Sequence, residues 1–176
     1  MSLPHIVIIG GGFGGLAAAR ALGDAPVRIT LVDRRNHHLF QPLLYQVATA
    51  ALNASDIARP IRRILRRQAN CEVILGEAES IDRFVRKVIL GDGEIGYDYL
   101  IIASGATHSY FGHDAWERDA PGLKTLEEAL DGRRSRTACW GRPHTRVACR
   151  PGPAGLPWLC PVCLVLKSLG KGTQKG

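Results

Sequence analysis

The chain has 176 residues, enough for one domain with a sizeable core, and its formal net charge at pH 7 is +7. The charge is uneven: residues 1–131 carry 14 basic and 16 acidic residues, whereas residues 132–176 carry nine basic residues and no acidic one. The first region is therefore net acidic (14 − 16 = −2), which argues against nucleic acid as its partner.

The first 33 residues predict a strand, a glycine turn, a helix and a second strand. Residues 5–9 form an apolar run typical of a parallel strand that is buried on both faces. Residues 14–22 are alanine-rich and predict a helix that ends near Gly23, and residues 27–32 predict the second strand. This order is one βαβ unit, and it predicts an α/β fold with a Rossmann-like parallel sheet.

The turn of this unit carries the fingerprint of a dinucleotide site, Gly10-x-Gly12-x-x-Gly15. Gly10 permits a tight turn, Gly12 lets a pyrophosphate approach the backbone, and Gly15 lets the helix pack closely on the sheet. Asp33 ends the second strand, where its carboxylate can accept hydrogen bonds from both ribose hydroxyls and would repel a 2′-phosphate. The candidate nucleotide contacts in the turn are Gly10, Gly11, Gly12, Phe13, Gly14 and Gly15.

A second helix is expected to begin at residues 53–56. Ser55 is a suitable N-cap, and Asp56 suits the positive end of a helix. Apolar residues then recur at helical spacing, at Ile57, Ile61, Ile64 and Leu65. The other faces carry arginines that we interpret as a solvated helix surface and not as a lipid or nucleic-acid site. These arginines are Arg59, Arg62, Arg63, Arg66 and Arg67.

Short strands follow this helix. Residues 71–75 predict a third strand, and residues 83–90 and 94–97 predict two more around a Gly-Asp-Gly turn. Residues 99–103 are another buried apolar run. The expected domain is thus a parallel sheet with helices and a small β insertion.

The sequence pattern changes at residue 132. Residues 132–176 mix Arg, Pro, Gly, Cys and Trp without a helical or strand period, so we expect a partial domain over residues 1–131 and a disordered basic tail. Our hypothesis is that the tail is translated from a wrong reading frame of a GC-rich gene. Reading the DNA after the Asp131 codon in the other two frames tests it, because an ordinary helical sequence must appear in one of them. Cys160 and Cys163 have metal-ligand spacing but no adequate partner pair, so no metal site is expected.

Residues 33–49, DRRNHHLFQPLLYQVAT, closely resemble the stretch after the second strand in bacterial type II NADH dehydrogenases. These flavoenzymes are non-proton-pumping NADH:quinone oxidoreductases. Residues 99–107, 109–113 and 120–124 resemble further motifs of that family, so that the resemblance covers about residues 4–131 and none of the tail. It implies a fold of the pyridine nucleotide-disulfide oxidoreductase superfamily.

The resemblance implies that FAD is the dinucleotide. The ADP half would lie on the glycine turn, the ribose on Asp33 and Arg34, and the adenine near Ala78. The stretch from Gln41 to Thr49 would approach the isoalloxazine. On the pyrophosphate side the resemblance places Ser104, where the family usually has Thr, and Gly105.

Intact family members pass a hydride from NADH to FAD and electrons on to a membrane quinone. Three family parts are missing here: a second glycine-rich unit for NADH, a returning segment that completes the FAD site, and C-terminal helices that hold the protein on the inner face of the cytoplasmic membrane. The cofactor carries out the redox chemistry and the protein positions it. We therefore expect this chain to look truncated and to be inactive alone; no catalytic residue is assigned.

Three alternatives stay open. One is another NAD(P)H-flavin oxidoreductase of the same fold. A second is a non-enzymatic binding module with a basic tail, and a third is an inert, poorly folded truncation product. The oligomeric state is open too, with a homodimer as one option.

Several residues are interpreted without a special function. His37 and His38 are read as polar surface or satisfied packing and not as proton carriers near quinone, and Cys71 is read as a buried hydrophobe. No targeting segment is evident, because the longest apolar stretch after the first strand, residues 156–166, is short and broken by prolines. The default expectation is a cytoplasmic protein with reduced thiols.

Overall fold

The computed structural model describes residues 2–118 and 121–140. The chain divides into two units, Met1–Arg134 and Ser135–Gly176, and the account below concerns the first. The last helix, α5 (Leu126–Trp140), begins in the first unit and continues past Asp131, where composition predicts a boundary. Residues 141–176, which include Cys160 and Cys163, lie outside the described residues.

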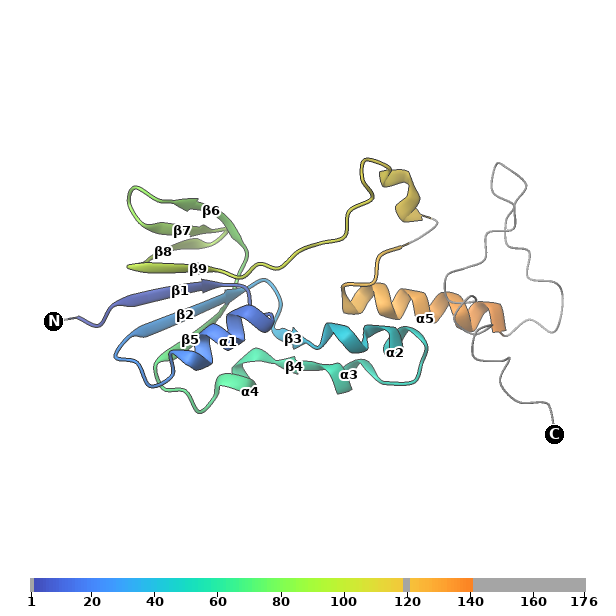
Figure 1. Cartoon of the computed structure of the whole chain (residues 1–176), viewed down its shortest axis with the longest axis horizontal. Coiled ribbons are helices and arrows are strands. Elements are labelled where there is room, and N and C mark those ends of the chain that lie inside the picture. Colours follow the sequence, from blue (N-terminus) through green and yellow to red (C-terminus); the bar gives the residue numbers. More distant parts are fainter. Residues whose placement is uncertain (1, 119–120, 141–176) are drawn as a thin grey trace, which may run out of the picture. The chain divides into compact units, whose positions relative to one another are not determined.

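A four-stranded parallel sheet forms the centre of the first unit (Figure 1). Its strand order is β5-β2-β1-β9, all neighbours being parallel. The strands are β1 (His5–Ile9), β2 (Arg28–Asp33), β5 (Cys71–Leu75) and β9 (Tyr99–Ile102). The predicted α/β fold with a parallel sheet is confirmed.

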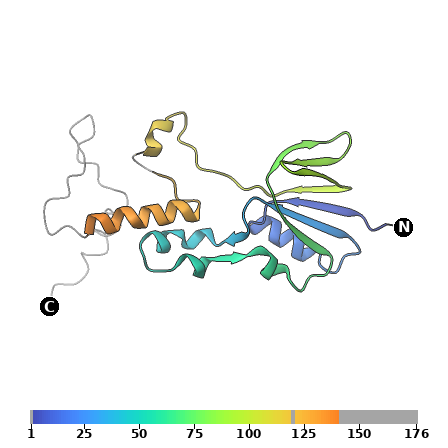
Figure 2. The ribbon, with the colours of Figure 1, turned by 180° about the vertical axis from the view of Figure 1, so that it is seen from behind.

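Apolar side chains alternate between the two faces of this sheet, as the strand period requires. On one face Ile6 and Ile8 pack against α1 (Phe13–Ala21), through Leu16 and Ala19. On the other face Val7 and its neighbours pack against a second sheet. In Figure 2, which is seen from behind, α1 lies on the far side of the parallel sheet. Both faces of the central strands are buried, which explains their continuous apolar sequence.

The second sheet is an antiparallel meander with the order β6-β7-β8. Its strands are β6 (Ala78–Asp82), β7 (Lys87–Leu90) and β8 (Gly93–Gly96). The insertion was predicted, but β6 was not, and the strand expected at residues 83–90 begins only at Lys87. The reason is local: Asp82 Oδ1 accepts the N–H groups of Phe84 and Val85 at 2.9 and 3.1 Å, which turns the chain there.

The expected long helix from residue 53 is interrupted by a strand. Pro60 cannot donate to a helix and disfavours helical backbone at Arg59, so β4 forms there and pairs with β3. Ser55 lies inside the first short helix; Asn53 is its N-cap and donates its N–H to Asp56 Oδ2 at 2.9 Å. The elements of this region are β3 (His37–Leu39), η1 (Gln41–Leu43), α2 (Leu44–Ala48), α3 (Ala54–Ile57), β4 (Ala58–Pro60) and α4 (Ile61–Leu65).

The helical cluster is a third core made by α2, α3 and the start of α5. Its buried members are Leu44, Val47, Ile57 and Ala129. A short helix η2 (Asp114–Arg118) precedes α5 in sequence. Within the described part of the chain, no helix is long and apolar enough to span a bilayer.

Candidate functional site

The glycine loop, residues 10–15, leaves β1 through a backbone conformation at Gly10 that favours glycine. Gly10 has a φ of +103°, and a Cβ there would collide with the carbonyl of Ala103. Its N–H donates to the Val32 carbonyl at 2.8 Å. A Cβ on Gly15 would collide with the carbonyl of Gly10. Gly10 and Gly15 thus have the structural roles expected of them, a tight turn and close helix packing.

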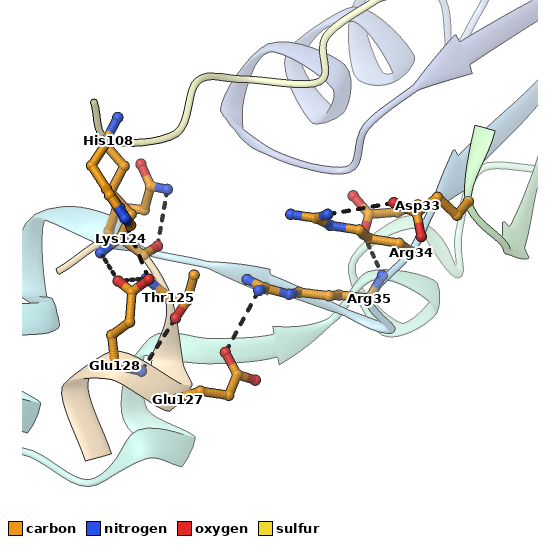
Figure 3. A network of polar contacts seen from close by, with 10 residues as sticks. Asp33, Arg34, Arg35, His108, Lys124, Thr125, Glu127 and Glu128 are labelled. Carbon is orange, nitrogen blue, oxygen red and sulfur yellow. Dashed lines mark hydrogen bonds and ion pairs between the residues drawn. The ribbon is translucent and has the colours of Figure 1, made fainter. Parts of the chain in front are cut away.

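The carboxylate of Asp33 holds the glycine loop. Asp33 Oδ2 accepts the N–H of Gly11 at 2.5 Å, and Oδ1 accepts the N–H of Arg35 at 2.6 Å. Figure 3 shows Asp33 beside Arg34 and Arg35 at the end of β2. A carboxylate has about four acceptor positions, so these two bonds leave capacity for hydroxyl donors. Sequence reasoning assigned Asp33 to a ribose and did not foresee its hold on the loop.

The first turn of α1 is open to an anion. Its N-cap is Gly12, no side chain caps it, and its first turn contains no acidic residue. A Cβ added at Gly12 would have no atom within 4 Å. The unpaired N–H groups and the positive helix end favour a phosphate at such a position. The loop therefore fits the pyrophosphate of a dinucleotide.

Arg34 and Ala78 lie at the same edge of the sheet as Asp33. The N–H of Gly76 donates to the Asp33 carbonyl at 2.9 Å, which brings the segment after β5 to the end of β2. Arg34 Nη1 lies 3.5 Å from Glu77 Oε1, and both side chains are exposed. Ala78 follows at the start of β6 and is partly buried. These candidate adenosine contacts are thus neighbours.

Ser104 and Gly105 follow β9 and lie beside the glycine loop. Both are exposed. A Cβ built on Gly10 would lie 3.2 Å from the backbone nitrogen of Ser104. Gly105 has a φ of +75°, a backbone conformation that favours glycine. The carboxyl ends of β1, β2 and β9 therefore supply one continuous edge.

Gln41 and Thr49 are placed differently from the loop residues. Gln41 Nε2 donates to the carbonyl of Lys124 at 3.3 Å. Thr49 is exposed at the end of α2, where its N–H donates to the Tyr45 carbonyl and its hydroxyl to the Gln46 carbonyl. The structure brings Gln41 to the segment after β9 and gives Thr49 a helix-ending role.

Charged groups join β2 to the start of α5 (Figure 3). Arg35 Nη2 lies 3.6 Å from Glu127 Oε2. A hydrogen bond from the N–H of Glu127 itself, helped by the charge of Arg35, holds the pKa of that carboxyl below its ordinary value against the opposing effect of burial. Glu128 caps the same helix, accepting the N–H of Lys124 at 2.6 Å and that of Thr125 at 3.1 Å.

Sequence reasoning missed a small aromatic group beside the loop. The ring of Phe13 meets the rings of His38 and Phe40 edge to face, with centroids 4.9 and 5.5 Å apart. His38 Nδ1 lies 3.1 Å from the Gly11 carbonyl oxygen. His38 was read as polar surface or satisfied packing; it is packed, and its partner is the glycine loop. No local pattern signals this contact, because it joins residues 27 positions apart.

A βαβ unit with an uncapped glycine turn, and an aspartate at the end of its second strand, defines a dinucleotide-binding α/β protein. A family model described as pyridine nucleotide-disulphide oxidoreductase matches residues 4–139, and the chain belongs to this family. The superfamily expected from the resemblance is confirmed.

Relatives refine this assignment. Two type II NADH:quinone oxidoreductases of Mycobacterium tuberculosis, NdhA and Ndh, are 52% and 49% identical over 131 residues. Each match covers 72% of this chain but only 28% of the relative, so the chain spans little more than a quarter of their length. The resemblance found in residues 4–131 is confirmed.

Solved structures agree on the fold. The sulfide:quinone oxidoreductase of Aquifex aeolicus aligns with a TM-score of 0.71 and 34% identity, over 80% of this chain and 33% of that one. The NDH2 of Plasmodium falciparum, solved in complex with NADH, aligns with a TM-score of 0.68 and 26% identity, over 74% and 28% of the two chains.

Proposed function

We propose that this chain is the FAD-binding N-terminal part of a type II NADH:quinone oxidoreductase. The observation that carries the proposal is the open first turn of α1 behind a glycine loop held by Asp33. The identity of about one half to two type II NADH:quinone oxidoreductases supports the choice of FAD, NADH and quinone. In the longer protein, bound FAD would supply the hydride-transfer and electron-transfer chemistry between NADH and a quinone.

The residues of this chain would bind and orient the ADP half. The backbone N–H groups at Gly12 and Phe13 would hold the pyrophosphate. Asp33 would accept the ribose hydroxyls while keeping its bond to Gly11. Arg34 and Ala78 would border the adenosine, and the remaining candidates, Gly14, Gln41, Thr49, Ser104 and Gly105, would lie along the rest of the flavin nucleotide.

Purification of the chain tests the proposal most simply. We expect the purified chain to retain a flavin, which chromatography identifies as FAD after release. We also expect the flavin-free chain to bind added FAD. FMN is the matched control, because it lacks the adenosine that the site at Asp33 would hold. Equal binding of FMN and FAD, or no binding of either, would contradict the proposed function.

Catalysis is expected only in the longer protein. This chain covers 28% of the length of its relatives, so most of their residues have no counterpart in it. We expect no quinone-dependent NADH oxidation by the chain with bound FAD, and activity by a protein extended to the full length of the relatives. Turnover by the chain alone would contradict this. Sulfide in place of NADH as the donor is a control for the longer protein, because a sulfide:quinone oxidoreductase has a similar fold.

Location, assembly and the tail belong to the same proposal. The intact protein would lie on the inner face of the cytoplasmic membrane through segments beyond this chain, and it would form a homodimer.

Residues 132–176 would be a tail without a role in FAD binding. Removing residues 141–176 is then expected to leave FAD affinity unchanged, and a loss of affinity would overturn that assignment.

A further inference from the structure

The contact between His38 and the glycine loop has a defined direction. A carbonyl oxygen only accepts hydrogen bonds, so the Nδ1 of His38, 3.1 Å from the oxygen of Gly11, must carry a proton and donate it. The ring is held in place, because His38 lies in β3, paired with Arg59 of β4, and meets Phe13 edge to face at 4.9 Å. His38 is half-buried, which strengthens a hydrogen bond relative to one in water.

Gly11 is consequently held on both sides. Its N–H donates to Asp33 and its carbonyl accepts from His38. The carbonyl of Gly11 and the N–H of Gly12 belong to one planar trans peptide and point in opposite directions. Fixing the carbonyl toward His38 therefore fixes the direction of the N–H of Gly12, which is the N-cap residue of α1.

We propose that His38 is a positioning residue for the nucleotide: its Nδ1–H sets the Gly11–Gly12 peptide so that the Gly12 N–H is aimed at the pyrophosphate before FAD arrives. This inference rests on the proposed function for its ligand, but the peptide orientation exists without any ligand. Preorganised donors bind more tightly because no loop has to be ordered on binding.

His37 provides a matched control on the same strand. Successive side chains of a strand point to opposite faces, so His37 is directed away from the contact that His38 makes. Its Nε2 is buried without a hydrogen-bond partner among the described residues. Replacing His37 changes a neighbouring imidazole and leaves the Gly11 contact in place.

Three variants of the full chain separate the donor from the ring. His38→Phe keeps an aromatic ring beside Phe13 and loses the donor, whereas His38→Asn keeps an N–H donor near the Nδ1 position and loses the ring. His37→Asn is the control. Fluorescence titration with FAD is expected to give about fivefold weaker binding for His38→Phe, the loss of roughly one hydrogen bond, and rescue by His38→Asn to within about twofold. Binding by His38→Phe as tight as by the unmodified chain would overturn the proposal.

A second measurement needs no FAD. In the ligand-free chain the ¹⁵N and ¹H shifts of the Gly12 amide are expected to change in His38→Phe and to stay unchanged in His37→Asn. The ¹⁵N shifts of the His38 ring in the unmodified chain are expected to show a protonated Nδ1. An unprotonated Nδ1 overturns the proposal even if His38→Phe does not fold.

The two proposals fail separately. If the unmodified chain binds no FAD, the proposed function fails, and the Gly12 and His38 shifts still decide whether the loop is held. If the unmodified chain binds FAD while His38→Phe binds equally well, the proposed function stands and the role of His38 is refuted.

Discussion

The sheet region and the helical cluster of this molecule are held together by different kinds of contact. At the glycine loop, backbone meets backbone so closely that a single Cβ on Gly10 or Gly15 would collide with a carbonyl. The helical cluster instead rests on buried side chains such as Leu44 and Ile57. Its segments are far apart in sequence, as the bond from Gln41 to Lys124, 83 positions on, illustrates.

The two regions therefore have different roles: the sheet region forms the ligand site, and the helical cluster closes a long loop. The sheet region fixes the nucleotide site by what the glycine backbone permits. The helical cluster has to offset the entropy of closing a long loop with apolar burial. Added volume should therefore harm the first region, and removed volume the second.

The largest effect is expected from Gly15→Ala. Its Cβ would meet the backbone carbonyl of Gly10, which cannot move without displacing β1, so we expect a loss of about 4 kcal/mol in the free energy of unfolding and no FAD binding. Denaturant unfolding measures the first and flavin titration the second. Gly14→Ala is the control for stability, since its Cβ would lie 3.6 Å from Ala103 Cβ, an ordinary contact. Equal stabilities of the two variants would show that the loop is not sterically fixed.

Leu44→Ala should damage the helical cluster and spare the sheet. Leu44 is 1% exposed, and truncation of a buried leucine costs about 3 kcal/mol. Hydrogen exchange is expected to quicken in α2 and α3 while β1 and β2 stay protected. Tyr45→Ala, at a neighbouring residue that is 53% exposed, should change little. Equal acceleration in β1 would mean that the two regions unfold as one.

Gly12→Ala isolates the ligand from the fold. No atom lies within 4 Å of the added Cβ, so we expect the free energy of unfolding to change by less than about 0.5 kcal/mol. The same methyl would stand where the pyrophosphate approaches, and FAD should bind at least about tenfold more weakly. Unchanged FAD affinity would place the pyrophosphate elsewhere.

Acid should weaken the sheet region through His5. Burial, and then the charge of Arg28, lowers the pKa of His5 below its ordinary value of 6.5. Arg28 Nη2 donates to His5 Nδ1 at 2.9 Å, so the neutral ring directs its Nε2–H to Thr30 Oγ1, 2.8 Å away. The unfolded chain then binds the proton more readily, and stability is lost as pH falls below about 6.5. Between about pH 7 and pH 5 the free energy of unfolding should depend less steeply on pH in His5→Gln than in the unmodified chain. The same pH dependence in both would exclude His5 as the cause.

The smallest effect is expected at the ion pair of Arg35 and Glu127. Glu127 is largely exposed, and such pairs contribute less than about 1 kcal/mol. Glu127→Gln and Arg35→Gln, with the double variant, measure the coupling in the free energy of unfolding. Coupling above that value would mean that this pair, and not apolar burial, closes the helical cluster.

The same division explains what the sequence predicted. The strands predicted at residues 5–9 and 99–103, the glycine loop and Asp33 follow from local patterns, because apolar runs and glycine spacing act on neighbouring residues. The pairing of β4 with β3 and the contact of His38 with Gly11 depend on partners far along the chain. The break at Pro60 and the turn at Asp82 have local causes that the apolar pattern did not signal. Asn53 displaced Ser55 as N-cap because Asp56 reaches back to its N–H.

The most direct test is an NMR titration of the isotopically labelled chain with FAD. The account predicts that the largest shifts occur at the amides of residues 10–15, at Asp33 and Arg34, and at Ser104 and Gly105. Saturating FAD without a change at residues 10–15, or with the largest changes on the arginine surface at residues 59–67, would contradict the assignment of the glycine loop as the nucleotide site.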